Sequence, residues 1–327
     1  MGCNNKEDEK PVSITERAMN KKVLPNEFYF VARALYTPGI FKYTFETKKN
    51  KIVWSSKNER VIELSYSEDL KSAFFITAKH YGRTGAFPYI KKVRLYILNT
   101  KTDQVNFVKL IGSGMEVYTR WETDDTFSIF LNSLDDKVAT YINQQKQIYN
   151  VFGKLLSDET KIYDLTSDGY PMPSRAEKSN LSPDGTNKFV VEIDSVNKYK
   201  VIIGESKNED IISTTQKLRQ FQWTADGNLV FTTADVSPSN KTLYTDKPES
   251  SKLLIYSPVK KEILKYWEGG GVKNFLIINN TLIFDTGFES KSKINMINLE
   301  TLKQFNVVKK IGGCGIKYIP ELPDYGK

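Results

Sequence analysis

The sequence is poor in the residues that build metal sites and disulfide frameworks. Among its 327 residues there is one histidine, His80, and there are two cysteines, Cys3 and Cys314. A multi-histidine zinc or iron site, a four-cysteine cluster and a network of disulfides each need more of these ligands than the chain has. We therefore predict neither a metal nor a cofactor, and we interpret Cys314 as a small buried thiol.

Long apolar segments are also missing. The longest apolar runs, residues 28–32 and 275–278, stop at Arg33 and Asn279. A membrane-spanning helix needs about 18 or more consecutive apolar residues. The sequence therefore predicts no transmembrane segment.

Arginine is scarce although the chain is basic. The formal net charge is +8, with about five lysines for every arginine. Arginine is the residue that makes forked contacts with phosphate and guanine, whereas scattered lysine mostly solvates a surface. We therefore predict no nucleic-acid partner.

The abundant residues recur in a β pattern. Short runs rich in Val, Ile, Phe, Tyr and Thr alternate with polar turns, and helical periodicity is nearly absent. A tight hairpin at an Asx or Asp-Gly turn recurs at residues 66–76, 121–130, 181–191, 223–231 and 278–284. A second strand pattern recurs at residues 41–47, 94–100, 139–143, 199–203, 253–257 and 294–299.

Six copies at intervals of roughly 40–60 residues predict an all-β, six-bladed β-propeller with four-stranded antiparallel blades. We expect one domain over residues 25–327, closed by pairing between residues 27–31 and 316–319. A β-sandwich with irregular hairpins is the structural alternative. The predicted blades span residues 25–60, 61–111, 112–158, 159–214, 215–268 and 269–322.

Two of the repeats carry a family resemblance. Ser182-Pro183-Asp184-Gly185, followed by Phe189-Val190, resembles the Pro-Asp variant of the WD40-like repeat in bacterial TolB-type propellers. Residues 224–227, followed by Val230-Phe231, echo it. The resemblance implies a six-bladed propeller over residues 25–322, without a role in the Tol system.

The N-terminus resembles the mature end of a bacterial lipoprotein. Gly2-Cys3 is followed by a polar stretch that ends at Pro11. This resemblance implies acylation of Cys3, a flexible tether over residues 1–24, and a membrane-anchored protein of the bacterial cell envelope that touches the membrane only through its lipid. Two alternatives are an unmodified tail cysteine and myristoylation at Gly2, which Lys6 disfavours. The combination of a six-bladed propeller with this lipoprotein-like end resembles the uncharacterised propeller lipoproteins of the bacterial envelope.

Bases and aromatic residues gather near the predicted starts of inner strands. We hypothesise an anionic ligand at one mouth of the central channel, held by arginines and stacked on aromatic rings. Alternatively, the bases pair with Asp124, Asp125 or Asp226 and the rings pack between blades. The candidate residues are Tyr118, Arg120, Arg175, Arg219, Trp223 and Lys273.

The segment 79–89 holds His80 and Arg83 between glycine and aromatic residues. It is either a recognition loop or a mobile hairpin. No Gly-x-Ser-x-Gly motif accompanies His80, and the paired aspartates are adjacent, so on a strand they point to opposite faces. We predict a monomeric, non-enzymatic propeller that binds a protein, peptide or glycan. A hydrolase or lyase acting on a polysaccharide or ester is the alternative.

Overall fold

The computed structural model describes residues 26–318, apart from residues 35–36, 68, 85–86, 172–180, 196–197, 205–209, 215–216, 235, 240–242, 247–250, 268–270 and 310–311. In this part of the chain the secondary structure is β, with a single 3-10 turn, η2 (Glu289–Lys291). No helix in the described ranges is long and apolar enough to cross a membrane.

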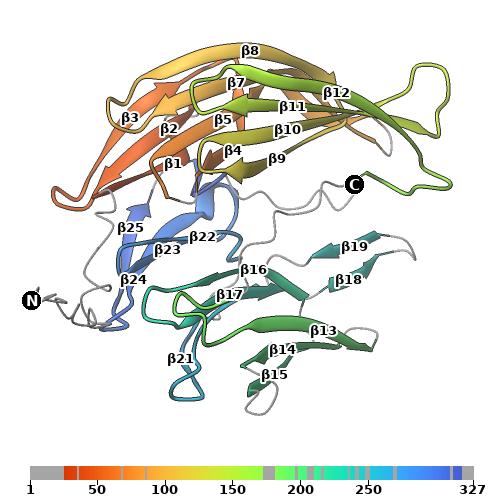
Figure 1. Ribbon diagram of the computed structural model, residues 1–327. Helices are drawn as coiled ribbons and strands as arrows, with labels where there is room; N and C mark the ends of the chain where they lie inside the picture. Colours follow the sequence, from red (N-terminus) through yellow and green to blue (C-terminus); the bar gives the residue numbers. More distant parts are fainter. Residues whose placement is uncertain are drawn as a thin grey trace, which may run out of the picture.

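Apart from the two-stranded sheet of β18 and β19, the described strands form six consecutive antiparallel sheets, which are the blades of a propeller. Figure 1 shows blades 1–3 in its upper half and blades 4–6 in its lower half. Blade 1 contains β26 (Cys314–Gly315), β1 (Glu27–Ala34), β2 (Thr37–Thr44) and β3 (Lys49–Ser55). Blade 2 contains β4 (Arg60–Tyr66), β5 (Ser72–Ala78), β6 (His80–Thr84), β7 (Phe87–Asn99) and β8 (Val105–Gly114). Blade 3 contains β9 (Glu116–Thr123), β10 (Thr126–Leu134), β11 (Tyr141–Asn150) and β12 (Leu155–Asp164).

The second half of the ring repeats this arrangement. Blade 4 contains β13 (Phe189–Ser195), β14 (Lys198–Ile203) and β15 (Asp210–Thr214). Blade 5 contains β16 (Lys217–Trp223), β17 (Leu229–Ala234), β20 (Lys252–Ser257) and β21 (Glu262–Trp267), with a hairpin of β18 (Val236–Ser239) and β19 (Leu243–Asp246). Blade 6 contains β22 (Phe275–Ile278), β23 (Thr281–Thr286), β24 (Lys293–Asn298) and β25 (Gln304–Lys309). The predicted six-bladed fold is confirmed.

Two blades depart from the four-stranded pattern. Blade 4 has three described strands, with an isolated bridge between Leu181 and Lys188 where the others have an inner strand. Blade 2 carries an additional strand, β6, which pairs with β7 and contains the predicted His80 segment. The hairpin turns follow the sequence prediction, because Gly185, Gly227 and Asn279 all have positive φ.

The C-terminal part of the chain closes the ring. Val31 and Ala32 of β1 pair with Gly315 and Cys314 of β26, which supplies the innermost strand of blade 1. The Leu64 N–H of blade 2 then donates to the Lys317 carbonyl at 2.7 Å. The predicted closure between the two ends of the domain is confirmed, with the paired strand at residues 314–315 rather than 316–319.

Asp285 of β23 secures this closure. Its carboxylate is fully buried and accepts hydrogen bonds from the backbone N–H groups of Lys273 (3.2 Å), Asn274 (2.9 Å) and Ile316 (3.0 Å). The Ser292 hydroxyl oxygen accepts a further bond from the N–H of Cys314, at 2.7 Å. Blade 6 therefore binds the segment that completes blade 1.

Hydrophobic clusters join neighbouring blades. Five clusters fill the contacts 6–1, 1–2, 2–3, 4–5 and 5–6, and the 6–1 cluster also contains Leu70 of blade 2. In blades 2 and 5 the second strand is buried on both faces, as Phe74 with Phe75 and Val230 with Phe231 show. Among the described residues, no such cluster joins blade 3 to blade 4.

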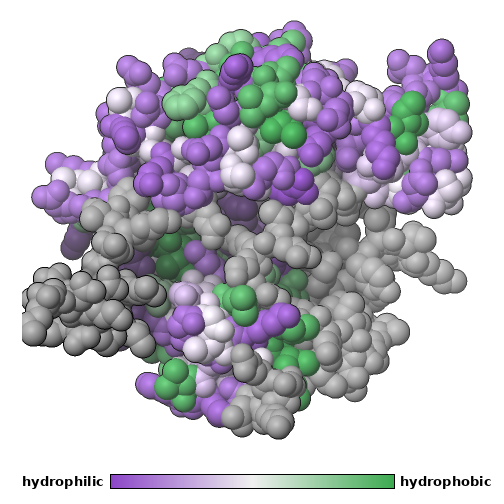
Figure 2. Space-filling model, viewed as in Figure 1, coloured by the Kyte–Doolittle hydropathy of each residue, from purple (hydrophilic) through white to green (hydrophobic). Residues whose placement is uncertain are grey.

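Apolar side chains are also exposed at the rim. Figure 2 shows a hydrophobic area over β8, where Phe107 and Leu110 are about half exposed. The outermost strands of other blades expose single residues in the same way, including Ile52 and Phe305. These residues sit on strands with a free edge, where one face of each side chain has no neighbouring blade to cover it.

Candidate functional site

Inner strands bring a set of polar side chains together around the axis of the ring. We call this set the channel cluster. Glu63 comes from β4 and Arg219 from β16, the first strands of their blades. The remaining members flank the closure of the ring, on β23, just before β22 or just after β26. They are Lys273, Asn274, Asp285, Lys317 and Tyr318.

Tyr318 connects these groups electrostatically. Burial is the main cause that raises the pKa of the Tyr318 hydroxyl to about 12, and the charge of Asp285 adds to it. The charge of Arg219 and a hydrogen bond with the Asn274 side chain act in the opposite direction. Because each of these groups influences the same phenol, they share one small region, and Tyr318 stays protonated there at neutral pH.

The two carboxyl groups of the channel cluster are both easier to protonate than usual. Burial raises the pKa of Glu63, although the charge of Lys317 and a hydrogen bond with Thr119 counteract it. Burial likewise raises the pKa of Asp285, against the hydrogen bonds that its carboxylate accepts. Desolvation disfavours the charged form of a carboxyl group, so the negative charge of the cluster is held weakly.

The cations of the cluster outnumber its carboxylates. The Lys273 ammonium nitrogen lies 5.6 Å from the centre of the Tyr318 ring and 5.7 Å from that of Phe288, within the range of cation–π attraction. Arg219 and Lys317 supply two further positive charges. The chemistry that this arrangement offers is recognition of a negatively charged group, with Tyr318 as a hydrogen-bond donor.

Of the sequence-predicted residues, the structure brings Arg219 and Lys273 together through Tyr318. Arg120 instead pairs with Glu122 on its own strand β9, at 2.6 Å, and stacks over the Phe130 ring at 5.5 Å. Arg120 therefore follows the alternative in which a base pairs with an acid, but its partner is Glu122 and none of the aspartates named from the sequence.

The other candidates are dispersed. Tyr118 donates a hydrogen bond to Glu116 at the start of β9, which also accepts one from Tyr170. Trp223 ends β16 and packs in the cluster between blades 4 and 5, 6.5 Å from Phe189 between ring centres. His80 is exposed at the first position of β6. Arg175, Cys3 and the side chain of Arg83 lie outside the described residues.

Sequence reasoning missed Glu63 and Asp285. A signal was present, because Glu63 and Asp285 each interrupt an apolar strand, RVIELSY and TLIFDT. A single acid inside a core strand has to be hydrogen-bonded or to face a polar interior. Lys317 and Tyr318 form a base–aromatic pair of the kind that gathers near the predicted strand starts, although neither was among the candidate residues.

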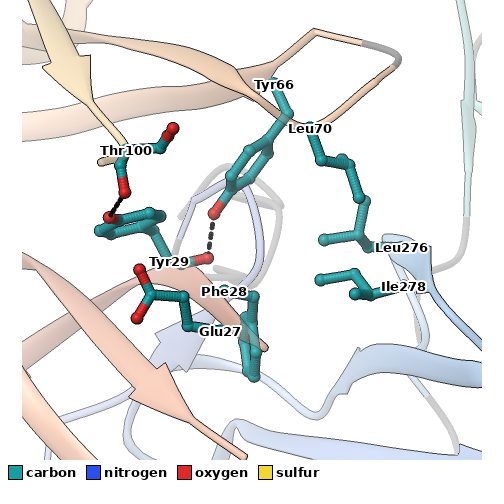
Figure 3. A pocket seen from close by; sticks show the side chains of 8 residues that line it. All are labelled: Glu27, Phe28, Tyr29, Tyr66, Leu70, Thr100, Leu276 and Ile278. Atoms are coloured by element: carbon teal, nitrogen blue, oxygen red, sulfur yellow. Dashed lines mark hydrogen bonds between the residues drawn. The ribbon is translucent and has the colours of Figure 1, made fainter. Parts of the chain in front are cut away.

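A small cavity lies where blades 1, 2 and 6 meet, and Figure 3 shows its lining. The Tyr66 hydroxyl points to the carbonyl of Tyr29, and the Tyr29 hydroxyl donates to the Thr100 carbonyl at 3.0 Å. Its volume of about 20 Å³ is enough for one water molecule and too small for an organic ligand. We interpret this cavity as structural.

In the described part of the chain, no group of three or more His, Cys, Asp or Glu side chains lies close enough to hold a metal ion.

Comparisons with known proteins return structures but no sequence family. No family model and no curated protein matches the chain. TolB from Acinetobacter baumannii is 12% identical, over 90% of this chain and 67% of that one, with a TM-score of 0.46. A prolyl endopeptidase is 10% identical, over 95% of this chain but 53% of that one, with a TM-score of 0.42. A chain of the nidogen/laminin complex is 9% identical, over 90% and 94%, with a TM-score of 0.44. Because these TM-scores are below 0.5, the fold is assigned from the strand topology, which makes the chain a six-bladed β-propeller.

Proposed function

We propose that this protein is a binding propeller whose channel cluster recognises a carboxylate-bearing segment of a protein, peptide or glycan. The observation that carries the proposal is the convergence of Arg219, Lys273 and Lys317 on a region whose two carboxyl groups have raised pKa values. Ion pairing in a partly desolvated channel is stronger than on an open surface, and the rigid blades hold the bases in place.

The proposed cellular setting follows from the N-terminal sequence. Gly2-Cys3 and the polar stretch after it support acylation of Cys3 and attachment to a bacterial envelope membrane. The propeller would act there as a monomer held at its membrane by the tether. Mass spectrometry of the membrane fraction from cells that express the full-length protein tests this part; an unmodified Cys3 in a soluble protein contradicts it.

Binding can be measured with two defined probes, a fluorescent hexaglutamate peptide and a fluorescent trigalacturonate. We expect saturable binding of at least one, and the pair separates a peptide ligand from a glycan. Replacing Arg219 with Gln, or Lys273 with Gln, removes a charge-assisted contact and is expected to weaken binding about tenfold. Arg120→Gln is the matched control, because Arg120 is paired with Glu122.

Each variant with weakened probe binding must have the same circular dichroism spectrum as the wild-type protein. If Arg219→Gln does not fold, Lys273→Gln is the variant that tests the site. Two results contradict the proposal. One is the absence of saturable binding for both probes, and the other is an equal effect of Arg219→Gln and Arg120→Gln.

One observation favours a second candidate function, an enzyme that cleaves an acidic polysaccharide or an ester. Glu63 has a raised pKa, as a general acid or base working near neutral pH requires, and Tyr318 stays protonated as a donor. Release of product from oligogalacturonate or an aryl ester would identify such an activity. Glu63→Gln should then abolish turnover while probe binding persists; turnover that survives this change assigns it to other residues.

A further inference from the structure

Blade 2 extends beyond the four-stranded pattern through β6. The chain leaves β5 at Ala78 and enters β6 at His80, and both strands pair with β7. The Lys79 N–H between them donates to the Lys91 carbonyl at 3.0 Å, so the pairing with β7 continues from one strand into the other. We call this extension, residues 79–92, the blade 2 arm.

The base of the blade 2 arm is fixed to the ring. Ile90 of β7 lies opposite Gly114 of β8 and Val93 lies opposite Gly112, so β7 has one additional residue at this point. This bulge lets Ile90 and Val93 both point into the buried cluster shared with blade 3. The arm is therefore a sheet extension that is anchored in the core.

The inner edge of β6 faces the axis of the ring. β5 pairs with β4 on its inner edge and with β7 on its outer edge. Because β6 continues β5 and also pairs with β7, its own inner edge lies just beyond the start of β4, where Arg60 is opposite Ala78. Glu63 of the channel cluster is opposite Ile76. At 3.3 Å per residue, this level of the channel is about 10 Å further in than Lys79.

The segment that precedes β4 does not run along this edge. It crosses the face of blade 2, where Glu59 accepts hydrogen bonds from the Thr77 hydroxyl at 2.6 Å and the Tyr96 hydroxyl at 3.0 Å. In the described part of the chain β6 is an edge strand that pairs with β7 alone. The N–H and C=O groups of such an edge can pair with an added strand. A strand added to β6 would extend the line of β4 outward from Arg60, with one end directed at the channel cluster.

The blade 2 arm is positively charged. Between Asp69 and Asp103 the sequence has seven bases and no acid, although the whole chain has 39 acids in 327 residues. Lys79, Lys91 and Lys92 are exposed, and no ion pair between described residues includes them. Charge complementarity therefore favours an acidic partner for this edge.

We propose that the blade 2 arm binds an extended acidic peptide segment of a partner protein, which adds to β6 as a further strand at the mouth of the channel. The inference deepens the proposed function and rests on it for the contact with the channel cluster, whereas the pairing with β6 does not depend on that contact. A polycarboxylate glycan matches the charge of the arm but has no peptide backbone with which to extend the sheet.

The strand pairing is tested with hexaglutamate and with the same peptide N-methylated at every residue, which keeps its carboxylates and loses its backbone N–H donors. An extended hexapeptide is about 20 Å long, so it can lie along β6 and reach the level of Glu63. We expect the methylated peptide to bind at least tenfold more weakly. Hexaglutamate should also slow hydrogen exchange of the β6 amides and leave those of β12 unchanged. Equal affinities of the two peptides, or unchanged exchange in β6, would overturn the pairing.

The charge of the arm is tested with two matched double variants. Lys79→Glu with Lys91→Glu should weaken hexaglutamate binding at least tenfold, because the arm then repels the peptide. Lys49→Glu with Lys154→Glu changes the net charge equally, at exposed positions next to β3 and β12 on the opposite side of the ring, and should change affinity less than twofold. Equal effects of the two double variants would count against the arm. If the first does not fold, as judged by circular dichroism, Lys79→Gln with Lys91→Gln replaces it.

Arg219→Gln separates this inference from the proposed function. Hexaglutamate binding that depends on Lys79 and Lys91 but not on Arg219 supports the arm and contradicts the channel site. Dependence on Arg219 alone leaves the channel site standing and overturns the arm. If trigalacturonate binding depends equally on Lys79 and Lys91, the assignment to a peptide is wrong, and if hexaglutamate does not bind, the arm is refuted as a peptide site.

Discussion

Asp285 is the residue whose removal tests the closure most directly. Asp285→Ala deletes the acceptor for three backbone N–H groups, those of Lys273, Asn274 and Ile316, at 2.9–3.2 Å. Each buried donor left without a partner costs about 1–3 kcal/mol. Relief of the desolvation that raises the pKa of Asp285 offsets part of this sum. We expect a net loss of about 3 kcal/mol, a large fraction of the 5–15 kcal/mol typical of a domain.

The assay is urea unfolding followed by tryptophan fluorescence, together with hydrogen exchange of the backbone amides. The Ile316 amide should exchange faster in Asp285→Ala, because its acceptor is gone, while amides of β10 and β11 should keep their rates. Asp285→Asn retains one acceptor oxygen, so its free energy of unfolding should lie between those of the wild-type protein and Asp285→Ala. Asp136→Ala, which removes an exposed acid from blade 3, is the control. A loss below 1 kcal/mol with unchanged exchange at Ile316 would refute the role of Asp285 in closure.

Three further predictions concern separate parts of the ring. Because protonation of Glu63 removes negative charge from the channel, probe affinity should rise as the pH falls toward the raised pKa of Glu63, and Glu63→Gln should weaken this pH dependence and leave the share due to Asp285; a fall in affinity as the carboxyl groups become protonated would contradict it. Burial alone would raise the pKa of Asp103, but hydrogen bonds from Lys42, Tyr29 and Lys51 lower this pKa below its ordinary value. Asp103 therefore stabilises the fold at pH values above the pKa that it has in the unfolded chain. This stabilisation is lost as the pH falls through the lower pKa of the folded protein. Asp103→Asn should therefore cost about 1 kcal/mol at pH 7 and progressively less as the pH falls below the unfolded pKa of an aspartate, as measured by urea unfolding; an equal loss at every pH argues against the ion pair. Gly39→Ala should destabilise the protein by about 2 kcal/mol or more, because the added Cβ would lie 2.4 Å from the Trp54 carbonyl oxygen; thermal unfolding at the wild-type temperature would count against this packing.

The sequence was sufficient for the architecture because each blade repeats a local signal. Gly185, Gly227 and Asn279 occupy left-handed positions in hairpin turns, and such residues mark a turn whatever surrounds them. The closure was predicted only approximately, because β26 has two residues and no periodicity of its own. Its position depends on Asp285 and Ser292, which are distant in sequence.

The candidate site was predicted less well, for a physical reason. Arg120 and Arg219 are both bases on inner strands next to an aromatic residue, and the sequence gives them equal standing. They differ in their partners. Arg120 pairs with Glu122 on its own strand, whereas the charge of Arg219 on β16 lowers the pKa of Tyr318, which follows β26 at the other end of the chain. Contacts between blades depend on the radius and tilt of the ring, and no local pattern encodes these.

The closure by β26 has a consequence for biosynthesis. The innermost strand of the first blade is made almost 300 residues after its partner β1, so the inner edge of β1 waits unpaired until residue 315 has left the ribosome. An exposed strand edge is a template for pairing with other chains. A nascent or prematurely terminated chain would thus present an adhesive edge to its neighbours, and slow completion of synthesis would favour entanglement between copies over ring formation.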